Sequence, residues 1–233
     1  MRDKMTISTT KAETVTAAIM SRITTRGFLE KSVPDDVLKS IFETARRTPS
    51  GGNLQPWNVH VLTGEPLDAF RGEVIGKLMQ GKTEGDTYQA YPSPLWEPMR
   101  TWRYKLGEDM YGLLGIAKDD KPARMMQVGQ NFNFFGAPVG ILVTIDKRMD
   151  APQFMDIGIY LQSLMLLARE QGLHTAPQGA WRAFPDTVKK HTGHPDEQQI
   201  LVGMSMGYAD PDKPVNDLIV DRAELSELVK FHT

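Results

Sequence analysis

The segment from residue 154 to residue 173, FMDIGIYLQSLMLLAREQGL, restricts the possible folds of this chain more than any other. Its length and spacing predict an α-helix, which Gly172 is expected to end. Apolar side chains cover most of its circumference: Ile157, Ile159, Tyr160, Leu161, Leu164, Met165, Leu167 and Ala168. A helix that is apolar nearly all round lies in the centre of a core or in an interface between subunits.

Strands and helices are mixed along the rest of the chain. Strands are expected at 58–63, 138–146 and 200–209, and further helices at 14–21, 37–47 and 67–79. Because these elements do not alternate in a steady strand–helix–strand order, an α+β fold is favoured over a doubly wound sheet. No repeat or linker divides the 233 residues, so one domain spanning 1–233 is expected.

The composition excludes several classes of protein. The chain has no cysteine, which rules out disulfides and thiolate metal sites, and its five histidines lack the spacing of metal ligands. A formal net charge of −2 without a basic tract argues against a nucleic-acid partner. No signal peptide and no stretch of about 18 apolar residues is present, so we expect a cytoplasmic protein that does not span a membrane.

Residues 80–123 differ in character from the rest of the chain. The segment is irregular and rich in aromatic residues, and a helix is expected near 97–114. Two interpretations remain open: an elaborated cap over the core, or an aromatic lid that lines a pocket.

Three polar segments could bind a ligand. Arg22, Thr24 and Arg26 present two guanidinium groups and a hydroxyl, which suit a phosphate, although arginine is also common at a helix end. The loop PSGGNLQPW at 49–57 and the stretch at 177–179 contain glycines that would let a ligand approach the main chain. Taken alone, each segment is explained at least as well without a ligand, the first as a solvated helix end and the other two as a turn or loop.

No Ser-His-Asp arrangement and no strong acid–base pair can be assembled from the spacing. A phosphate clamp without evident catalytic side chains suggests that a cofactor performs the chemistry.

The order of the motifs resembles the FMN-dependent nitroreductase family, in particular its nitrobenzoate and dinitroaniline reductase-like subgroup. R-x-[ST]-x-R follows the first helix, P-S-x-x-N-x-Q-P-W precedes the first strand, and a P-[EQ]-G-like turn follows the long apolar helix. N-F-x-F-F-G-A-P-V-G at 131–140 and G-Y-A-D-P-D-K-P-V-N, followed by Arg222, match as well. The resemblance covers about residues 14–228.

The resemblance implies a nitroreductase-like α+β homodimer with a central, mostly antiparallel sheet flanked by helices. Two FMN sites would lie at the subunit interface, the 154–173 helix would pack across it, and the C-terminal extension would be exchanged between subunits. Residues 80–123 would form a helical, aromatic lid or cap.

The resemblance also assigns roles to residues. Those at the FMN phosphate and ribityl end would be Arg22, Thr24 and Arg222, and Arg26 would approach the pyrimidine edge of the flavin. The other subunit would contribute Pro49, Ser50, Asn53 and Gln55. Along the flavin would lie Pro177, Gln178 and Gly179, with the Gly179 backbone N–H near N5. No catalytic side chain is expected, because the chemistry would occur at FMN N5.

The implied reaction takes hydride from NADPH or NADH and then reduces a nitroaromatic compound by two electrons. Candidate substrate-pocket residues are Trp96, Met99 and Trp102. The same fold also serves reductive dehalogenation, enone or quinone reduction and flavin fragmentation, and a flavin-binding module without turnover is a further alternative. The residues do not identify the physiological substrate or the preferred nicotinamide.

Overall fold

A four-stranded sheet lies at the centre of the computed structural model, which describes residues 7–232. The strands run in the order β1-β2-β4-β3, and each neighbouring pair is antiparallel. Their bounds are β1 Asn58–Thr63, β2 Val139–Asp146, β3 His174–Gln178 and β4 Gln198–Gly207. The expected α+β fold and its antiparallel sheet are therefore confirmed, together with the three expected strands.

Strand β3 replaces part of the turn expected at 177–179. Pro177 and Gln178 pair with Met204 and Gly203 of β4, and only Gly179 lies beyond the strand, where it opens the short helix η3 (Gly179–Ala183). A proline is tolerated because β3 is an edge strand, whose outer side needs no backbone donor.

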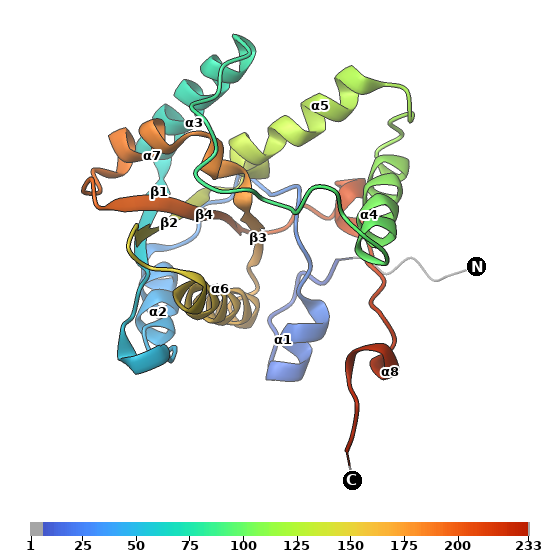
Figure 1. Ribbon diagram of the computed structural model, residues 1–233, viewed down its shortest axis with the longest axis horizontal. Helices are drawn as coiled ribbons and strands as arrows, with labels where there is room; N and C mark the ends of the chain where they lie inside the picture. Colours follow the sequence, from blue (N-terminus) through green and yellow to red (C-terminus); the bar gives the residue numbers. More distant parts are fainter. Residues whose placement is uncertain (1–6, 233) are drawn as a thin grey trace.

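Helices cover both faces of the sheet (Figure 1). On one face lie α2 (Asp35–Ala45) and α6 (Ala151–Glu170), and on the other lie α3 (Gly64–Met79) and α7 (Pro185–Thr192). The central strand β2 is therefore buried from residue 139 to residue 145. Its nearly continuous apolar sequence follows from this position, because neither face of the strand meets water.

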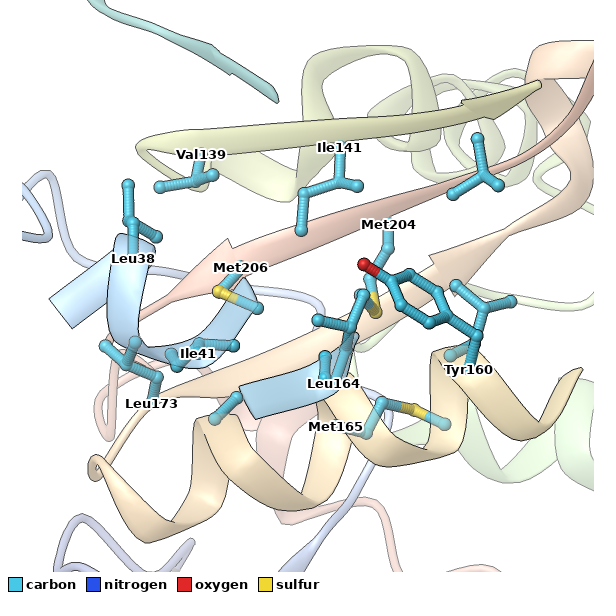
Figure 2. Packing of buried hydrophobic residues seen from close by; sticks show 14 of the residues in the cluster. Leu38, Ile41, Val139, Ile141, Tyr160, Leu164, Met165, Leu173, Met204 and Met206 are labelled. Carbon is cyan, nitrogen blue, oxygen red and sulfur yellow. The ribbon is translucent and has the colours of Figure 1, made fainter. Parts of the chain in front are cut away.

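Helix α6 is the helix expected at 154–173, and Gly172, with a φ of 76°, follows its C-cap residue Gln171. Figure 2 shows how its buried side chains meet β2, β4 and α2, with labels on Tyr160, Leu164, Met165, Leu38, Ile41, Val139, Ile141, Met204 and Met206. On its other side Met155 and Ile159 stay 67% and 46% exposed. The helix is thus only partly covered by its own chain.

An aromatic cluster fills the space under α3 and α7. Trp181 of η3 has no exposed surface. Its indole stacks on Phe134 with the ring centroids 4.4 Å apart, and it contacts Phe70 and Phe132 with centroids at 5.0 and 5.5 Å. This packing holds η3, which begins at Gly179, against the sheet.

The buried Arg169 near the end of α6 fastens the N-terminal segment to the core. Its guanidinium donates to the carbonyl oxygens of Ser8 and Thr10, at 3.3 and 2.7 Å, and to Oγ of Ser21 at 3.1 Å. His174 lies against the same guanidinium. Burial and the Arg169 charge lower the pKa of His174 to about 4. Helix α1 (Val15–Ser21) is thereby held beside α6.

Two helices between α3 and β2 project beside the β3 edge (Figure 1). They are α4 (Met99–Leu113) and α5 (Lys121–Gly129), and none of their side chains is buried. The short helix η2 (Gln130–Gly136) leads back to β2. After β4 the chain passes through η4 (Pro214–Asp217) and ends in the short helix α8 (Leu225–Leu228). Within residues 7–232, no helix is both long and apolar enough to cross a membrane.

Candidate functional site

A cavity of about 550 Å³, here called the inner cavity, opens where the end of β3 meets α4 and α5. Residues 177–179 and Arg26 form part of its lining. These two segments meet because Thr24 forms a parallel bridge with Thr175 of β3, and the Thr25 N–H donates to the Thr175 carbonyl oxygen at 3.1 Å. The structure therefore brings together two of the three segments singled out in the sequence.

Arg26 is held in place from two sides. Its backbone N–H donates to Oδ1 of Asn216 at 2.9 Å, and its guanidinium donates to the Thr24 carbonyl oxygen at 3.2 Å. Burial lowers the pKa of Arg26, and no carboxylate within residues 7–232 offsets this effect. A desolvated cation of this kind favours a ligand that carries negative charge.

The main chain at Gly179 is open to the inner cavity, and a Cβ at this position would lie 3.3 Å from the hydroxyl oxygen of Tyr88. The side chain of Gln178 faces the interior instead. Its Oε1 accepts from Oγ of Ser205 at 2.9 Å, and its Nε2 donates to the Asn131 carbonyl oxygen at 2.6 Å. Only the main chain of Gln178 would therefore be available to contact a ligand.

Arg22 and Arg222 come from opposite ends of the chain, and Arg222 lies near enough for its charge to act on Arg22. Burial, together with the nearby charge of Arg222, lowers the pKa of Arg22. Arg222 is exposed, and its Nη1 donates to the carbonyl oxygens of Val220 and Asp221. Two neighbouring guanidinium groups that repel one another are stabilised when an anion such as a phosphate lies between them.

The loop at 49–57, the remaining one of the three segments, is separate from the inner cavity. None of its candidate residues lines that cavity: Pro49, Ser50, Asn53 and Gln55. The loop lies at the lower end of α2 in Figure 1, away from α4 and α5, and contains the short helix η1 (Gly51–Asn53). The Gly51 N–H donates to Oδ1 of Asp156 in α6 at 3.1 Å. Within one chain the loop cannot complete this site, so its role at a cofactor stays a prediction.

A second cavity of about 540 Å³ lies between α4 and the segment after η4. Met99 and Trp102 line it, whereas Trp96 is 58% exposed and lines neither cavity. Tyr91 and Arg103 line both cavities and form part of the wall between them. The proposed substrate contacts of Trp96, Met99 and Trp102 therefore stay predictions.

Most residues that line the inner cavity were not sequence candidates, among them Tyr91, Arg103 and Arg182. The Arg103 guanidinium lies over the Tyr91 ring, 4.4 Å from its centroid. Arg182 donates from Nη1 to the Gly179 carbonyl oxygen at 2.7 Å. For Arg182, the only signal in the sequence was its position three residues after Gly179. For Arg103 there was none, because helix α4 buries no side chain and so has no apolar pattern from which the direction of Arg103 could be predicted.

The sequence model of the nitroreductase family matches residues 19–208. The chain belongs to the nitroreductase family. This nitroreductase is 39% identical over 206 residues to the 4-nitrobenzoate reductase of Pseudomonas putida, covering 88% of this chain and 90% of the relative. It is 37% identical over 219 residues to the chloronitrobenzene nitroreductase of Comamonas testosteroni, covering 91% and 94% of the two chains.

The same relationship holds for the fold. The FMN and NADPH-dependent nitroreductase NfnB of Sphigopyxis sp. strain HMH superposes on this nitroreductase with a TM-score of 0.90 and 39% sequence identity. The match covers 94% of this chain and 99% of NfnB. The family and the nitroreductase-like fold implied by the motif order are thus confirmed.

Proposed function

We propose that this nitroreductase binds FMN at the inner cavity and uses NADPH or NADH to reduce nitroaromatic compounds by two electrons. The observation that carries the proposal is the meeting of Arg26 with the main chain of residues 177–179 at one cavity. The relatives named for nitrobenzoate and chloronitrobenzene support the choice of substrate class. When bound, FMN supplies the hydride-transfer chemistry, and the protein supplies binding, orientation and electrostatics.

The candidate donors suit the parts of FMN: Arg26 and residues 177–179 line the inner cavity, and Arg222 lines the second cavity. Arg22 and Arg222 would hold the phosphate, with the Thr24 hydroxyl as a neutral donor beside them. Arg26 would lie at the edge of the flavin that gains negative charge on reduction, where a desolvated cation stabilises that charge. Gly179 has no side chain to block a flat ring from its backbone N–H.

A second subunit would complete the site in our proposal. Val15 and Met20 of α1 are 67% and 77% exposed, Met155 and Ile159 of α6 are 67% and 46% exposed, and α1 contacts α6. Large exposed apolar patches mark interaction surfaces. Because the 49–57 loop is hydrogen-bonded to α6, a homodimer formed through α1 and α6 would carry that loop toward the partner's cofactor.

The segment at 80–123 would act as the lid of the substrate pocket. Helix α4 separates the inner cavity from the second cavity and buries none of its side chains in the core, so it can change without disturbing the sheet. Substrate specificity is therefore expected to change with substitutions in α4.

The proposal is tested on the purified protein in three steps. Flavin absorbance after incubation with FMN and gel filtration tests cofactor binding, and the elution volume tests the dimer. Stopped-flow reduction by NADPH and by NADH then identifies the donor. Finally, reoxidation by nitroarenes is compared with reoxidation by halogenated aromatics, enones, quinones and oxygen alone. Failure to bind FMN, or reoxidation by nitroarenes no faster than by oxygen, would refute the proposed function.

A further inference from the structure

The inner cavity holds more positive charge than one flavin ring requires. Its charged lining residues are Arg26, Arg103 and Arg182, and no described aspartate or glutamate lines it. The proposed function uses Arg26 at the cofactor. Two guanidinium groups, those of Arg103 and Arg182, are then left for the second ligand that enters the same cavity.

Arg182 lines the cavity, and its side chain is only 21% exposed. Its Nη1 donates to the Gly179 carbonyl oxygen, which leaves the rest of the guanidinium to other partners. Asp86 is the nearest carboxylate, with Oδ1 3.5 Å from Nε, and its side chain is 51% exposed. The buried Nε makes no hydrogen bond within residues 7–232. Asp86 therefore offsets the Arg182 charge only in part.

Arg103 of α4 lines the same cavity as Arg182. Its guanidinium lies over the Tyr91 ring, and no ion pair joins it to a carboxylate in the described part of the chain. Arg100, three residues earlier on α4, is different, because its Nε lies 2.6 Å from Oε1 of Glu97. Arg103 and Arg182 also line a third, outer cavity of about 570 Å³ together with Tyr91. They thus stand at the boundary between the inner cavity and the outer one.

We infer that Arg103 and Arg182 bind the carboxylate of an anionic nitroaromatic compound, so that this enzyme prefers nitroaromatic acids to neutral nitroarenes. The inference rests on the proposed function and narrows its substrate class. Guanidinium groups bind carboxylates through paired, charge-assisted hydrogen bonds. The Tyr91 ring beside Arg103 offers a flat surface for the aromatic part of such a substrate. Membership of the family does not decide the point, since one relative is named for a nitrobenzoate and another for a neutral chloronitrobenzene.

Ligand binding to the oxidised, FMN-loaded enzyme tests this inference without turnover. The probes are benzoate and benzamide, which match in shape and differ in charge, and the readout is the change in flavin absorbance. The wild-type enzyme should bind benzoate more tightly than benzamide. Arg103→Gln should raise the Kd of benzoate about tenfold, the lower end for a hydrogen bond to a charged group because Arg103 is exposed. Arg182→Lys should also raise the Kd of benzoate, since lysine keeps the charge and loses the planar donor pair.

The control is Arg100→Gln, which removes the same charge from the same helix where Glu97 already neutralises it. Its Kd for benzoate should change less than twofold. Neither Arg103→Gln nor Arg100→Gln should change the Kd of benzamide by more than twofold.

Turnover provides a second readout, in which the difference in intrinsic reactivity between the two substrates cancels. The ratio of kcat/KM for 4-nitrobenzoate to that for 4-nitrobenzamide should fall about tenfold in Arg103→Gln relative to wild type, because ring electronics cancel when ratios are compared. Equal binding of benzoate and benzamide by the wild-type enzyme would overturn the inference. An increased KM for NADPH in Arg103→Gln with an unchanged Kd for benzoate would also overturn it, because the arginines would then serve a nucleotide phosphate.

The two proposals fail in different ways. An enzyme that binds FMN, is reduced by a nicotinamide and reduces neutral nitroarenes without regard to charge would refute the carboxylate preference and leave the proposed function intact. An enzyme that binds no FMN, or is reduced by neither nicotinamide, would refute both.

Discussion

Gly203 of β4 lies directly against Trp181, and replacing it with alanine should destabilise the fold strongly. A Cβ at Gly203 would lie 2.1 Å from Cδ1 and 2.5 Å from Nε1 of the indole, so one of the two groups must move. Trp181 is fully buried and stacks on Phe134, with the ring centroids 4.4 Å apart. The backbone of β4 is held on both sides by β2 and β3. Neither group can therefore give way without loss of packing.

The expected cost follows from these contacts. Overpacking a filled core costs about 1–3 kcal/mol, and the rigid neighbours of Gly203 place this site at the upper end, about 3 kcal/mol. For a chain of this size, that loss corresponds to a decrease in Tm of roughly 6–12 °C. Because Trp181 anchors η3, the same substitution should also disturb Gly179 and weaken FMN binding.

Urea unfolding followed by tryptophan fluorescence measures the loss of stability, and FMN titration measures the effect on the site. Gly72→Ala is the matched control, since no atom lies within 4 Å of its Cβ position on the exposed side of α3. This change should stabilise the protein by about 0.5–1 kcal/mol through helix propensity. If Gly203→Ala unfolds within about 0.5 kcal/mol of wild type, well below the range for overpacked cores, the reasoning about a rigid Trp181 is refuted.

Two further predictions concern the loop and the buried histidine. Asn53→Ala should weaken FMN retention on gel filtration several-fold, as the loss of about one hydrogen bond implies. The free energy of unfolding should fall by only about 1 kcal/mol, because the φ of 57° at Asn53 lies in the left-handed region that alanine adopts less readily. A variant that keeps its FMN but loses more stability than this would show that the loop is only a structural turn. Lowering the pH from 6.5 to 4 should reduce the free energy of unfolding by about 3 kcal/mol through His174, because the unfolded chain takes up a proton near pH 6.5 and the folded chain only near 4. Urea unfolding at several pH values measures this slope, and an unchanged slope in His174→Gln would assign it to other groups.

The elements predicted correctly from the sequence are those with a strong local pattern. The continuous apolar run at 138–146 and the apolar helix at 154–173 correspond to β2 and α6. Both could be predicted because a strand or helix that packs against several neighbours needs apolar residues at most of its positions. Strand β3 was missed for two reasons. Its five residues include a proline, and the strand with which it pairs, β4, follows only after η3 and α7. Pairing across such a distance leaves no periodic signal in a short edge strand.

The candidate site shows the same division. Arg22, Thr24 and Arg26 could be named because they form a compact motif, and the structure places Arg26 beside residues 177–179 through the bridge between Thr24 and Thr175. Arg103 and Arg182 could not be named, because nothing in a single sequence distinguishes a cavity arginine from a solvated one. Only the structure shows that Glu97 pairs with Arg100, whereas Arg103 lies over the Tyr91 ring and lines the inner cavity.

The sequence by itself determined the family, the α+β class and the presence of the apolar helix α6, since these depend on motif order and on apolar periodicity within continuous segments. The tertiary structure decided where the motifs meet: it joined residues 22–26 to the end of β3, brought Arg222 to Arg22, turned the side chain of Gln178 inward and kept the 49–57 loop away from the inner cavity. Each of these outcomes depends on contacts between residues far apart in the chain. Such contacts arise from packing on the shared sheet, which no local pattern of residues encodes.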